Sequence, residues 1–181
     1  GNPELRPETS ENFEIGVVQA LFEKRLHMSG TFFYNQWFNL IDFEAGPPPQ
    51  LVNRSEVISK GAEFEWALQA AESLSAHAHL TYTKTEIAGS GEALRKRPEW
   101  RGGLDVHWQA ASDITSTLGW FYVGKTHDSS IATGDLTLGD YTRVDVSAIW
   151  AWSANGQLIA AVDNVLDTRY EEVVGFPAPG I

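Results

Sequence analysis

Two pairs of polar side chains have residue types and a spacing that could carry chemistry. His77 and His79 are two residues apart, so on one face of a strand their imidazoles are able to ligate a metal ion or a haem. Glu63 and Glu65 share this spacing, and same-face carboxylates about 7 Å apart fall within the range of an inverting glycosidase. Nothing in the sequence marks either glutamate as a general acid, and the plainer interpretation of the histidines is a pair of polar side chains lining a wet surface. We therefore predict no catalytic residue, no metal ligand and no cofactor.

The composition excludes several other functions. The 181 residues include no cysteine, so a disulfide, a thiol nucleophile or a thiolate metal site is impossible. The formal net charge is −11, from 13 basic and 24 acidic residues, whereas a nucleic-acid-binding protein needs a basic face. The longest purely apolar run, Ala148–Trp152, is far shorter than the roughly 20 residues of a membrane-spanning helix. The chain starts with Gly1 rather than Met and shows no signal segment, so we expect a piece of a longer, exported protein.

The dominant hydrophobic period is two residues, which is typical of β-strands because successive side chains point to opposite faces. The pattern predicts eight strands and no helix. The predicted strands cover Phe13–Leu21, Leu26–Tyr34, Gly61–Leu68, Ala76–Thr83, Trp100–Trp108, Leu118–Tyr122, Val144–Trp150 and Leu158–Leu166.

The predicted connections alternate between short and long. Short turns lie near residues 23–25, 70–73, 111–113 and 153–156, and long loops lie at 43–53, 88–98, 125–140 and from 171 onward. This alternation favours an antiparallel up-and-down meander, and transmembrane β-barrels combine short periplasmic turns with long extracellular loops in the same way. A propeller has a similar repeat length, but each of its repeats would need four strands, and only two fit in this chain.

Aromatic residues recur at both ends of the apolar face. Trp66, Trp108 and Trp150 are 42 residues apart, each shortly before a short turn. Other aromatic residues lie near the opposite strand ends, as in the two interfacial girdles of a membrane barrel. The predicted girdle consists of Tyr34, Trp66, Tyr82, Trp100, Trp108, Tyr122 and Trp150. In the alternative interpretation, these residues form the core of a soluble β-sandwich.

The opposite face of the predicted strands is polar. Its members either line a wet lumen or face bulk water, and periodicity alone does not separate the two. The candidate lumen residues are Glu14, Glu63, Glu65, His77, His79, Arg101, Asp105 and Asp145. A basic cluster at a loop base, Arg95-Lys-Arg97, either touches lipopolysaccharide phosphates or is solvated charge.

Six short motifs follow one another along the chain. They are the Asn2-Pro-Glu-Leu-Arg-Pro-Glu stretch that leads to Gly16, Asn53 with Ser59-Lys-Gly-Ala-Glu-Phe-Glu65, Arg97-Pro-Glu-Trp100, Tyr141-Thr-Arg-Val-Asp145, Asn164-Val-Leu-Asp-Thr-Arg-Tyr170 and Pro177-Ala-Pro-Gly180. In this order they resemble the motifs of TonB-dependent outer-membrane receptors, with Asn164, Asp167 and Tyr170 as the clearest motif residues. The sequence departs from the family at Ile181, where the family has arginine after Pro-x-Pro-Gly.

The resemblance implies a 22-stranded barrel around an N-terminal plug. It also implies active uptake of a scarce ligand, such as a ferric siderophore, haem or cobalamin, across the outer membrane of a Gram-negative cell. The implied partners are the remaining barrel and plug, the TonB protein, a small-molecule ligand, and membrane lipid with lipopolysaccharide. At about 23 residues per strand, 22 strands need about 500 residues. We therefore expect residues 1–181 to be the C-terminal portion of an incomplete barrel, without the plug or the last strand. The alternative is a secreted β-sandwich that binds carbohydrate.

Overall fold

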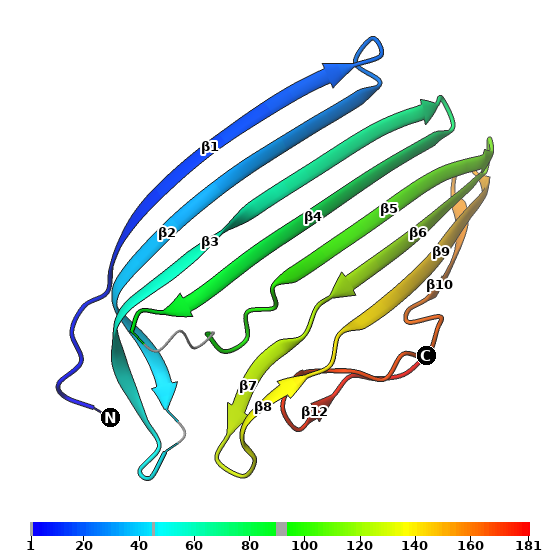
Figure 1. Cartoon of the computed structure of the whole chain (residues 1–181). Coiled ribbons are helices and arrows are strands. Elements are labelled where there is room, and N and C mark those ends of the chain that lie inside the picture. Colours follow the sequence, from blue (N-terminus) through cyan, green and yellow to red (C-terminus); the bar gives the residue numbers. More distant parts are fainter. Residues whose placement is uncertain (1, 45, 90–93) are drawn as a thin grey trace.

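The computed structural model of the chain describes residues 2–44, 46–89 and 94–181. Its main element is one eight-stranded antiparallel sheet, in which each strand pairs with its neighbour along the meander (Figure 1). The strands, in spatial order, are β1 (Thr9–Leu21), β2 (Leu26–Glu44), β3 (Gln50–Ala71), β4 (Leu74–Ile87), β5 (Trp100–Ala111), β6 (Ile114–Val123), β9 (Tyr141–Ser153) and β10 (Gly156–Val162). The predicted all-β, antiparallel meander of eight strands is confirmed.

The long connections contain more strand than the sequence predicts. β7 (Thr126–Ser130) and β8 (Gly134–Leu138) form a hairpin between β6 and β9, and β11 (Glu171–Val173) pairs with β12 (Phe176–Pro177). The predicted loop at 43–53 is also largely strand, because β2 and β3 stay paired as far as Glu44 and Gln50. β7 contains no apolar residue, and the apolar residues of β8 and of the extensions of β2 and β3 form runs too short for periodicity to identify them. The last predicted strand is too long, since β10 ends at Val162 and Asn164 adopts a left-handed φ of 54°.

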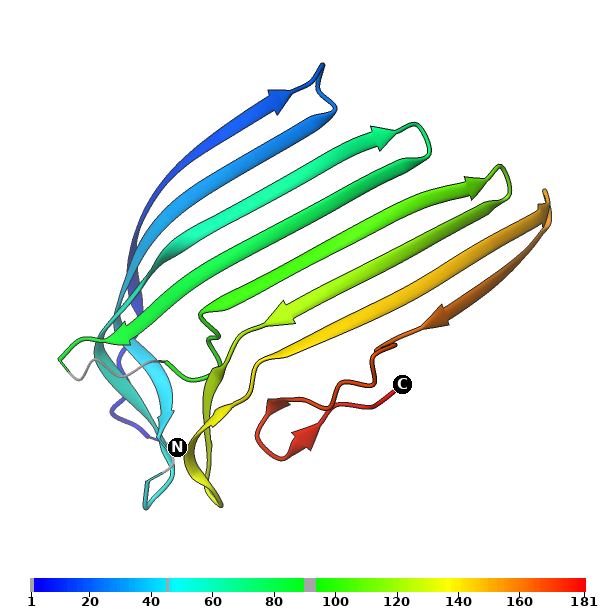
Figure 2. The same ribbon diagram turned by 45° about the vertical axis from the view of Figure 1, so that its right-hand side comes forward.

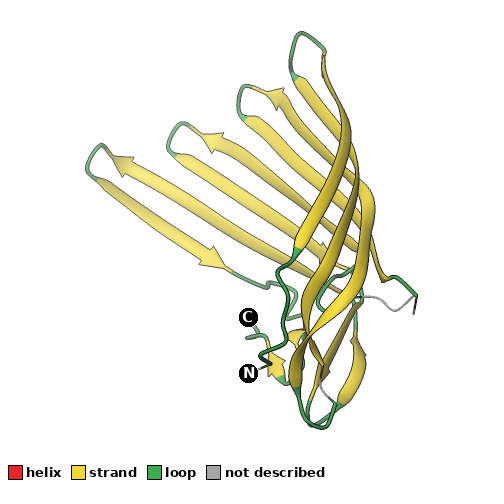
Figure 3. Ribbon diagram, turned by 90° about the vertical axis from the view of Figure 1, so that its left-hand side faces the viewer, coloured by secondary structure: helices red, strands yellow, loops and turns green. Residues whose placement is uncertain are grey.

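The two ends of the sheet differ as the sequence predicts. The four short turns lie at one end, and the long connections with both chain termini lie at the other (Figures 1 and 2). The sheet curves as a single layer (Figure 3). The described residues contain no helix long and apolar enough to cross a membrane.

The strand register divides the sheet into two unlike faces. Phe32, Ala62 and Tyr82 are Cα partners on one face, and Thr31, Glu63 and Thr81 are partners on the other. In the described part of the chain no second sheet packs on the apolar face, whose large side chains include Phe13, Phe32, Trp108 and Leu158, each more than half exposed. A sandwich must bury this face between two sheets, so the β-sandwich alternative is wrong for this chain.

The described buried core is small and lies at the long-loop end. Val57, Ile87 and Leu94 form it, with Trp37 and Leu40 packed against them. It therefore fastens the loop segment before β5 to the paired extensions of β2, β3 and β4. Between this core and the short turns, the sheet is held by its backbone ladder and by cross-strand side-chain contacts.

Candidate functional site

The polar face brings together side chains from neighbouring strands. His77 is the Cα partner of Asp105 on β5, and His79 is the partner of Glu65 on β3. The two imidazole centroids are 6.3 Å apart. By register, all eight candidate lumen residues lie on this one face: Glu14, Glu63, Glu65, His77, His79, Arg101, Asp105 and Asp145. Among the described residues, no group of three or more histidine or acidic side chains is placed to hold a metal ion.

The seven aromatic residues of the predicted girdle lie on the apolar face, again by register. Tyr82 and Trp100 are cross-strand partners with ring centroids 4.7 Å apart. Near the short turns, the indole N–H of Trp150 donates to the Asp113 carboxylate at 2.9 Å. Trp152, which is not a member of the predicted girdle, lies on the same face and contacts Trp150.

Asn164 holds the segment that follows β10. Its side chain is 3% exposed, its amide Nδ2 donates to the Thr168 carbonyl at 3.0 Å, and its Oδ1 accepts the Thr168 N–H at 3.0 Å. Its own N–H donates to Asp145 on β9 at 2.8 Å. Asp167, in the same tight turn, accepts the Ile181 N–H at 3.3 Å. Two of the family-like motifs, those ending in Asp145 and Tyr170, thus meet at one buried amide.

Tyr170 completes this motif cluster from the other side. Its ring stacks on Tyr141 with centroids 3.9 Å apart, and its carbonyl accepts the Ala178 N–H. Arg143, between Tyr141 and Asp145 on the same strand face, pairs with Asp145 at 2.9 Å and covers the Phe121 ring. The cluster has a structural effect, since it fixes the path of residues 164–181 against β9.

Asn53 makes a similar clamp for the N-terminal segment. Its Oδ1 accepts the Arg6 N–H at 2.8 Å, and its Nδ2 donates to the carbonyls of Arg6 and Asn39. Glu8 accepts the Ile41 N–H at 2.6 Å. The motif segment before β1 is therefore fastened along the extended hairpin of β2 and β3.

A third cluster joins four segments of the long-loop end. Asp128 on β7 is almost completely buried, and it accepts hydrogen bonds from Arg95, Ser129 and Val174 at 3.3, 2.9 and 3.1 Å. Arg95 also donates to the Phe43 carbonyl and lies over the Phe43 ring. The interpretation of Arg95 as solvated or lipopolysaccharide-binding charge is therefore wrong, because its guanidinium is paired inside the loops.

The electrostatics of Asp128 follow from these contacts. Burial by itself would raise the pKa of the Asp128 carboxyl, but the N–H groups of Val174 and Ser129 and the positive charges of Lys96 and Arg95 outweigh it, so the pKa is lowered. Because the pKa of Asp128 is lowered in the folded state, its ionised carboxylate stabilises the fold at any pH above the ordinary pKa of aspartate. That stabilisation is lost as the pH falls through the folded value.

Substitution of Asp128 is expected to loosen the loop end. Asp128→Asn removes the charge opposite Arg95 and should cost the loops about 1–3 kcal/mol. Limited proteolysis would then cut the β7–β8 hairpin faster, while the exposed control Asp135→Asn on the same hairpin should behave like the unsubstituted chain. Lowering the pH below the usual pKa range of aspartate should speed cleavage of the unsubstituted chain, as Asp128→Asn does at neutral pH. The same change should alter cleavage of the Asp128→Asn variant little. Equal cleavage of both variants at neutral pH would contradict this role.

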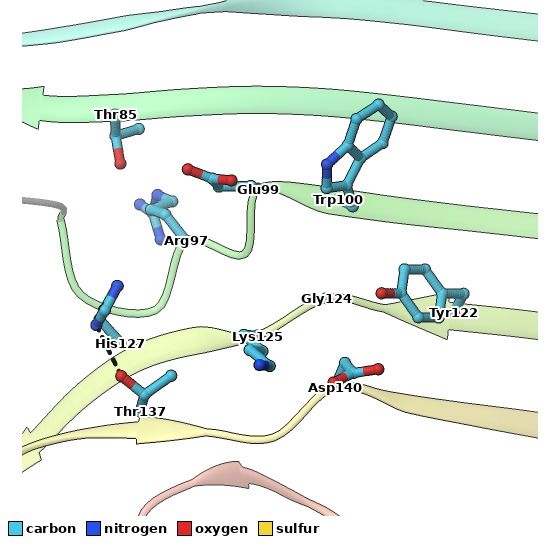
Figure 4. Close-up of a pocket in the computed structure, with 10 residues that line it drawn as sticks. All are labelled: Thr85, Arg97, Glu99, Trp100, Tyr122, Gly124, Lys125, His127, Thr137 and Asp140. Carbon is cyan, nitrogen blue, oxygen red and sulfur yellow. Dashed lines mark hydrogen bonds between the residues drawn. The ribbon is translucent and has the colours of Figure 1, made fainter.

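A hollow of ≈ 440 Å³ lies between the ends of β4 to β6 and the β7–β8 hairpin. Figure 4 shows Trp100 and Tyr122 at its strand side and Arg97, Lys125 and His127 at its loop side. Glu99 and Asp140 also line it, so its formal charges balance. His127 is held by a 3.1 Å hydrogen bond to Thr137.

Sequence reasoning missed the Arg95–Asp128 pair and the clamp made by Asn53. Asp128 lies in a predicted loop with no motif around it, and its partners are 33 and 46 residues away. Asn53 belongs to one of the six motifs, but only the structure gives it a partner. The one signal in the sequence is an aspartate in a polar loop, which is too common to identify a buried pair.

Comparison with known proteins identifies the family. Residues 1–165 match the family model described as TonB dependent receptor-like, beta-barrel. The iron-regulated outer membrane virulence protein of Vibrio cholerae serotype O1 is 28% identical over 186 residues, covering 92% of this chain and 28% of that protein. The ferrienterobactin receptor of Escherichia coli K12 is 28% identical over 190 residues, covering 93% of this chain and 25% of the receptor.

Solved structures agree on the fold. The ferric-catecholate import receptor Fiu of Escherichia coli K12 superposes with a TM-score of 0.78 at 20% identity, over 96% of this chain and 25% of that one. The ferric enterobactin receptor PfeA of Pseudomonas aeruginosa gives 0.77 at 23% identity, over 99% and 31%. The chain thus spans between a quarter and a third of the proteins that it resembles. With its matching family model, sheet and motifs, the chain belongs to the TonB-dependent receptor family of outer-membrane β-barrels.

Proposed function

We propose that residues 1–181 form the C-terminal portion of the barrel of a receptor that imports a scarce ligand, with energy supplied through TonB. One observation carries the proposal: a single curved sheet with one continuous apolar face and one continuous polar face. Such a sheet suits a wall between lipid and water. The ligands named for the relatives, ferrienterobactin and vitamin B12, support a ferric siderophore or cobalamin as cargo. The role is binding and transport rather than catalysis.

In this proposal the polar face lines the lumen. Glu63, Glu65 and Asp105 would keep this part of the wall hydrated and acidic, and the plug and the remaining strands would be its partners. The TonB contact, the plug and most of the ligand-binding loops would lie outside residues 1–181. The clamps at Asn53 and Asn164 would set the loop end from which ligand enters.

The apolar face would meet lipid, with aromatic residues at both interfaces. Trp66, Trp108 and Trp150 form the proposed girdle near the short turns, and Tyr34, Tyr82, Trp100 and Tyr122 form the girdle near the loops. Along β5, Trp100 and Trp108 are eight residues apart, which is about 26 Å of strand and about 20 Å after a tilt of roughly 40°. That height is close to the ~25 Å apolar band of outer-membrane barrels.

Single cysteines distinguish the two faces, because this chain has none of its own. In the complete receptor, Glu63→Cys is expected to react with a water-soluble maleimide. The side chain of the next residue points to the other face. Phe64→Cys should therefore react with the water-soluble maleimide at least about tenfold more slowly than Glu63→Cys, and it should react with a lipid-soluble probe. Equal labelling of both positions by the aqueous reagent would contradict a barrel wall.

Uptake measurements test the transport role. Cells that lack the receptor should lose high-affinity uptake of one radiolabelled cargo among ferric siderophores, haem and cobalamin, and cells that lack TonB should lose the same uptake. Complementation with the receptor gene restores it only in the presence of TonB. Unchanged uptake of all three cargo classes in the receptor-deficient strain would overturn the proposed function.

A further inference from the structure

The short turn between β9 and β10 contains a pair of residues with intrinsic covalent reactivity. Of the seven asparagines in the chain, only Asn155 precedes a glycine. The backbone nitrogen that follows an asparagine is able to attack the side-chain carbonyl carbon, and a glycine at that position has no Cβ to hinder the approach. The other asparagines precede proline or a residue with a larger side chain: Asn2, Asn12, Asn35, Asn39, Asn53 and Asn164.

The turn leaves the Asn155 side chain open to this reaction. Ala154 and Asn155 connect the paired residues Ser153 and Gly156, at the short-turn end of the sheet (Figure 2). Asn155 is exposed, and its backbone N–H donates to the Ser153 hydroxyl at 3.3 Å. Within the described ranges no hydrogen bond holds its side-chain amide. The amide is therefore free to turn toward the Gly156 nitrogen.

Two features at Gly156 favour the attack. The register of the β9–β10 ladder shifts between Gly156 and Leu158, so the backbone here is less regular than in the body of the strand. Packing also favours glycine at this position, because a Cβ on Gly156 would lie 2.6 Å from the ring of Trp152. A larger residue, which would shield Asn155, fits at position 156 only if the indole moves.

Asn164 shows the opposite conditions in the same region of the chain. Its side chain is 3% exposed, and both its Nδ2 and its Oδ1 are engaged with Thr168. The residue that follows it is Val165, whose N–H donates to the Val144 carbonyl. The fold therefore protects the asparagine that it uses as a clamp and leaves the asparagine of the turn unprotected.

We propose that Asn155 is a site of spontaneous deamidation in the folded protein. The Gly156 nitrogen loses its proton to water and forms a bond to Cγ of Asn155, and the side-chain nitrogen takes up a proton and leaves as ammonia. Water then hydrolyses one of the two C–N bonds of the resulting succinimide, which gives aspartate or isoaspartate at position 155. The inference goes beyond the proposed transport role and holds for any cargo.

Either product changes the short-turn end of the sheet. Aspartate adds a negative charge to the turn that follows Trp150 and Trp152. Isoaspartate also inserts one backbone carbon atom between the paired ends of β9 and β10, which lengthens the turn. The modification therefore marks the age of the protein at one defined place.

The test uses the complete receptor in detergent, incubated at neutral and at mildly alkaline pH in water labelled with heavy oxygen. Peptide mass spectrometry should find the amide of residue 155 replaced by a carboxyl that carries the label, and an isoaspartate methyltransferase should methylate the same peptide. Conversion should be faster at alkaline pH, because the attacking nitrogen must lose its proton. Asn164 should convert at least about a hundredfold more slowly, because its buried amide must first leave its hydrogen bonds.

Two variants and an unfolded reference complete the experiment. Gly156→Ala places a methyl group beside the attacking nitrogen, and Asn155→Gln requires a larger ring, so each should slow conversion at least about tenfold. The folded receptor should convert within about tenfold of the rate of the receptor unfolded in urea, because the turn needs no global unfolding to react. Conversion confined to the unfolded receptor, or an unchanged rate in both variants, would overturn the inference.

Discussion

The 181-residue chain expressed alone is expected to aggregate in water and to become soluble only in detergent. The apolar face exposes more than half of the surface of Phe13, Val17, Trp108 and Leu158, among others. Such a continuous patch far exceeds the few hundred Å² that soluble monomers tolerate. In the sheet, β1 and β10 have one neighbour each, so both present unpaired N–H and C=O groups to other chains.

Size-exclusion chromatography with and without detergent measures this expectation. Without detergent, more than about nine-tenths of the protein should elute in the void volume or precipitate, because edge pairing and apolar contact reinforce each other. Detergent covers the face but leaves the two edges open, so we expect small oligomers there rather than a clean monomer. A sharp monomer peak at 20.0 kDa in plain buffer would contradict the membrane-wall interpretation of the apolar face.

The sequence predicts the faces well because strand periodicity is a local property. In β3, Phe64 and Trp66 alternate with Glu63 and Glu65, and pairing with β2 and β4 preserves that parity across the sheet. The register shifts at Gln69 and Gln109 lie beside the short turns, so they do not exchange the faces of the strands. The short turns account for the pairing of β1 with β2, β3 with β4, β5 with β6 and β9 with β10.

The loop end is where local reasoning fails. In the β7–β8 hairpin, the sequence Thr-His-Asp-Ser-Ser of β7 contains no apolar residue, and the alternation in β8 is limited to Leu136 and Leu138. What orders it is Asp128, whose partners Arg95 and Val174 come from two other loops. Contacts of this kind depend on the three-dimensional arrangement of distant segments, so no pattern within one segment reports them.

The sequence identifies the motif residues but not their contacts. The resemblance identifies Asn53, Asp145, Asn164 and Tyr170 without saying what each side chain does. In the structure these residues share one physical role, because each of them pairs backbone or side-chain groups of a segment that has left the ladder. An asparagine suits this role because its amide both donates and accepts, and because asparagine tolerates the left-handed backbone that Asn164 adopts.

Replacement of Asn164 by alanine is expected to have the largest effect of any single substitution in the motif cluster. It removes the bonds to the Thr168 N–H and carbonyl in a site that is 3% exposed, and it puts alanine at a φ of 54°. Unpaired buried groups cost about 1–3 kcal/mol each, and a left-handed alanine adds about 1 kcal/mol. We expect a loss of about 3–7 kcal/mol in the free energy of unfolding.

Three further substitutions resolve the causes of that loss in urea unfolding of the detergent-solubilised receptor. Asn164→Gly relieves the backbone strain but still loses the amide, so it should recover only about 1 kcal/mol relative to alanine. Asn164→Asp keeps the acceptor for the Thr168 N–H and the tolerance of a left-handed φ, so its stability should lie between that of the glycine variant and that of the unsubstituted receptor. The exposed turn control Asn155→Ala should change stability by less than about 0.5 kcal/mol. If Asn164→Ala were no worse than Asn155→Ala, the buried amide would not hold residues 164–181 in place. The stability of this part of the barrel would then come from the backbone ladder of β9 and β10 alone.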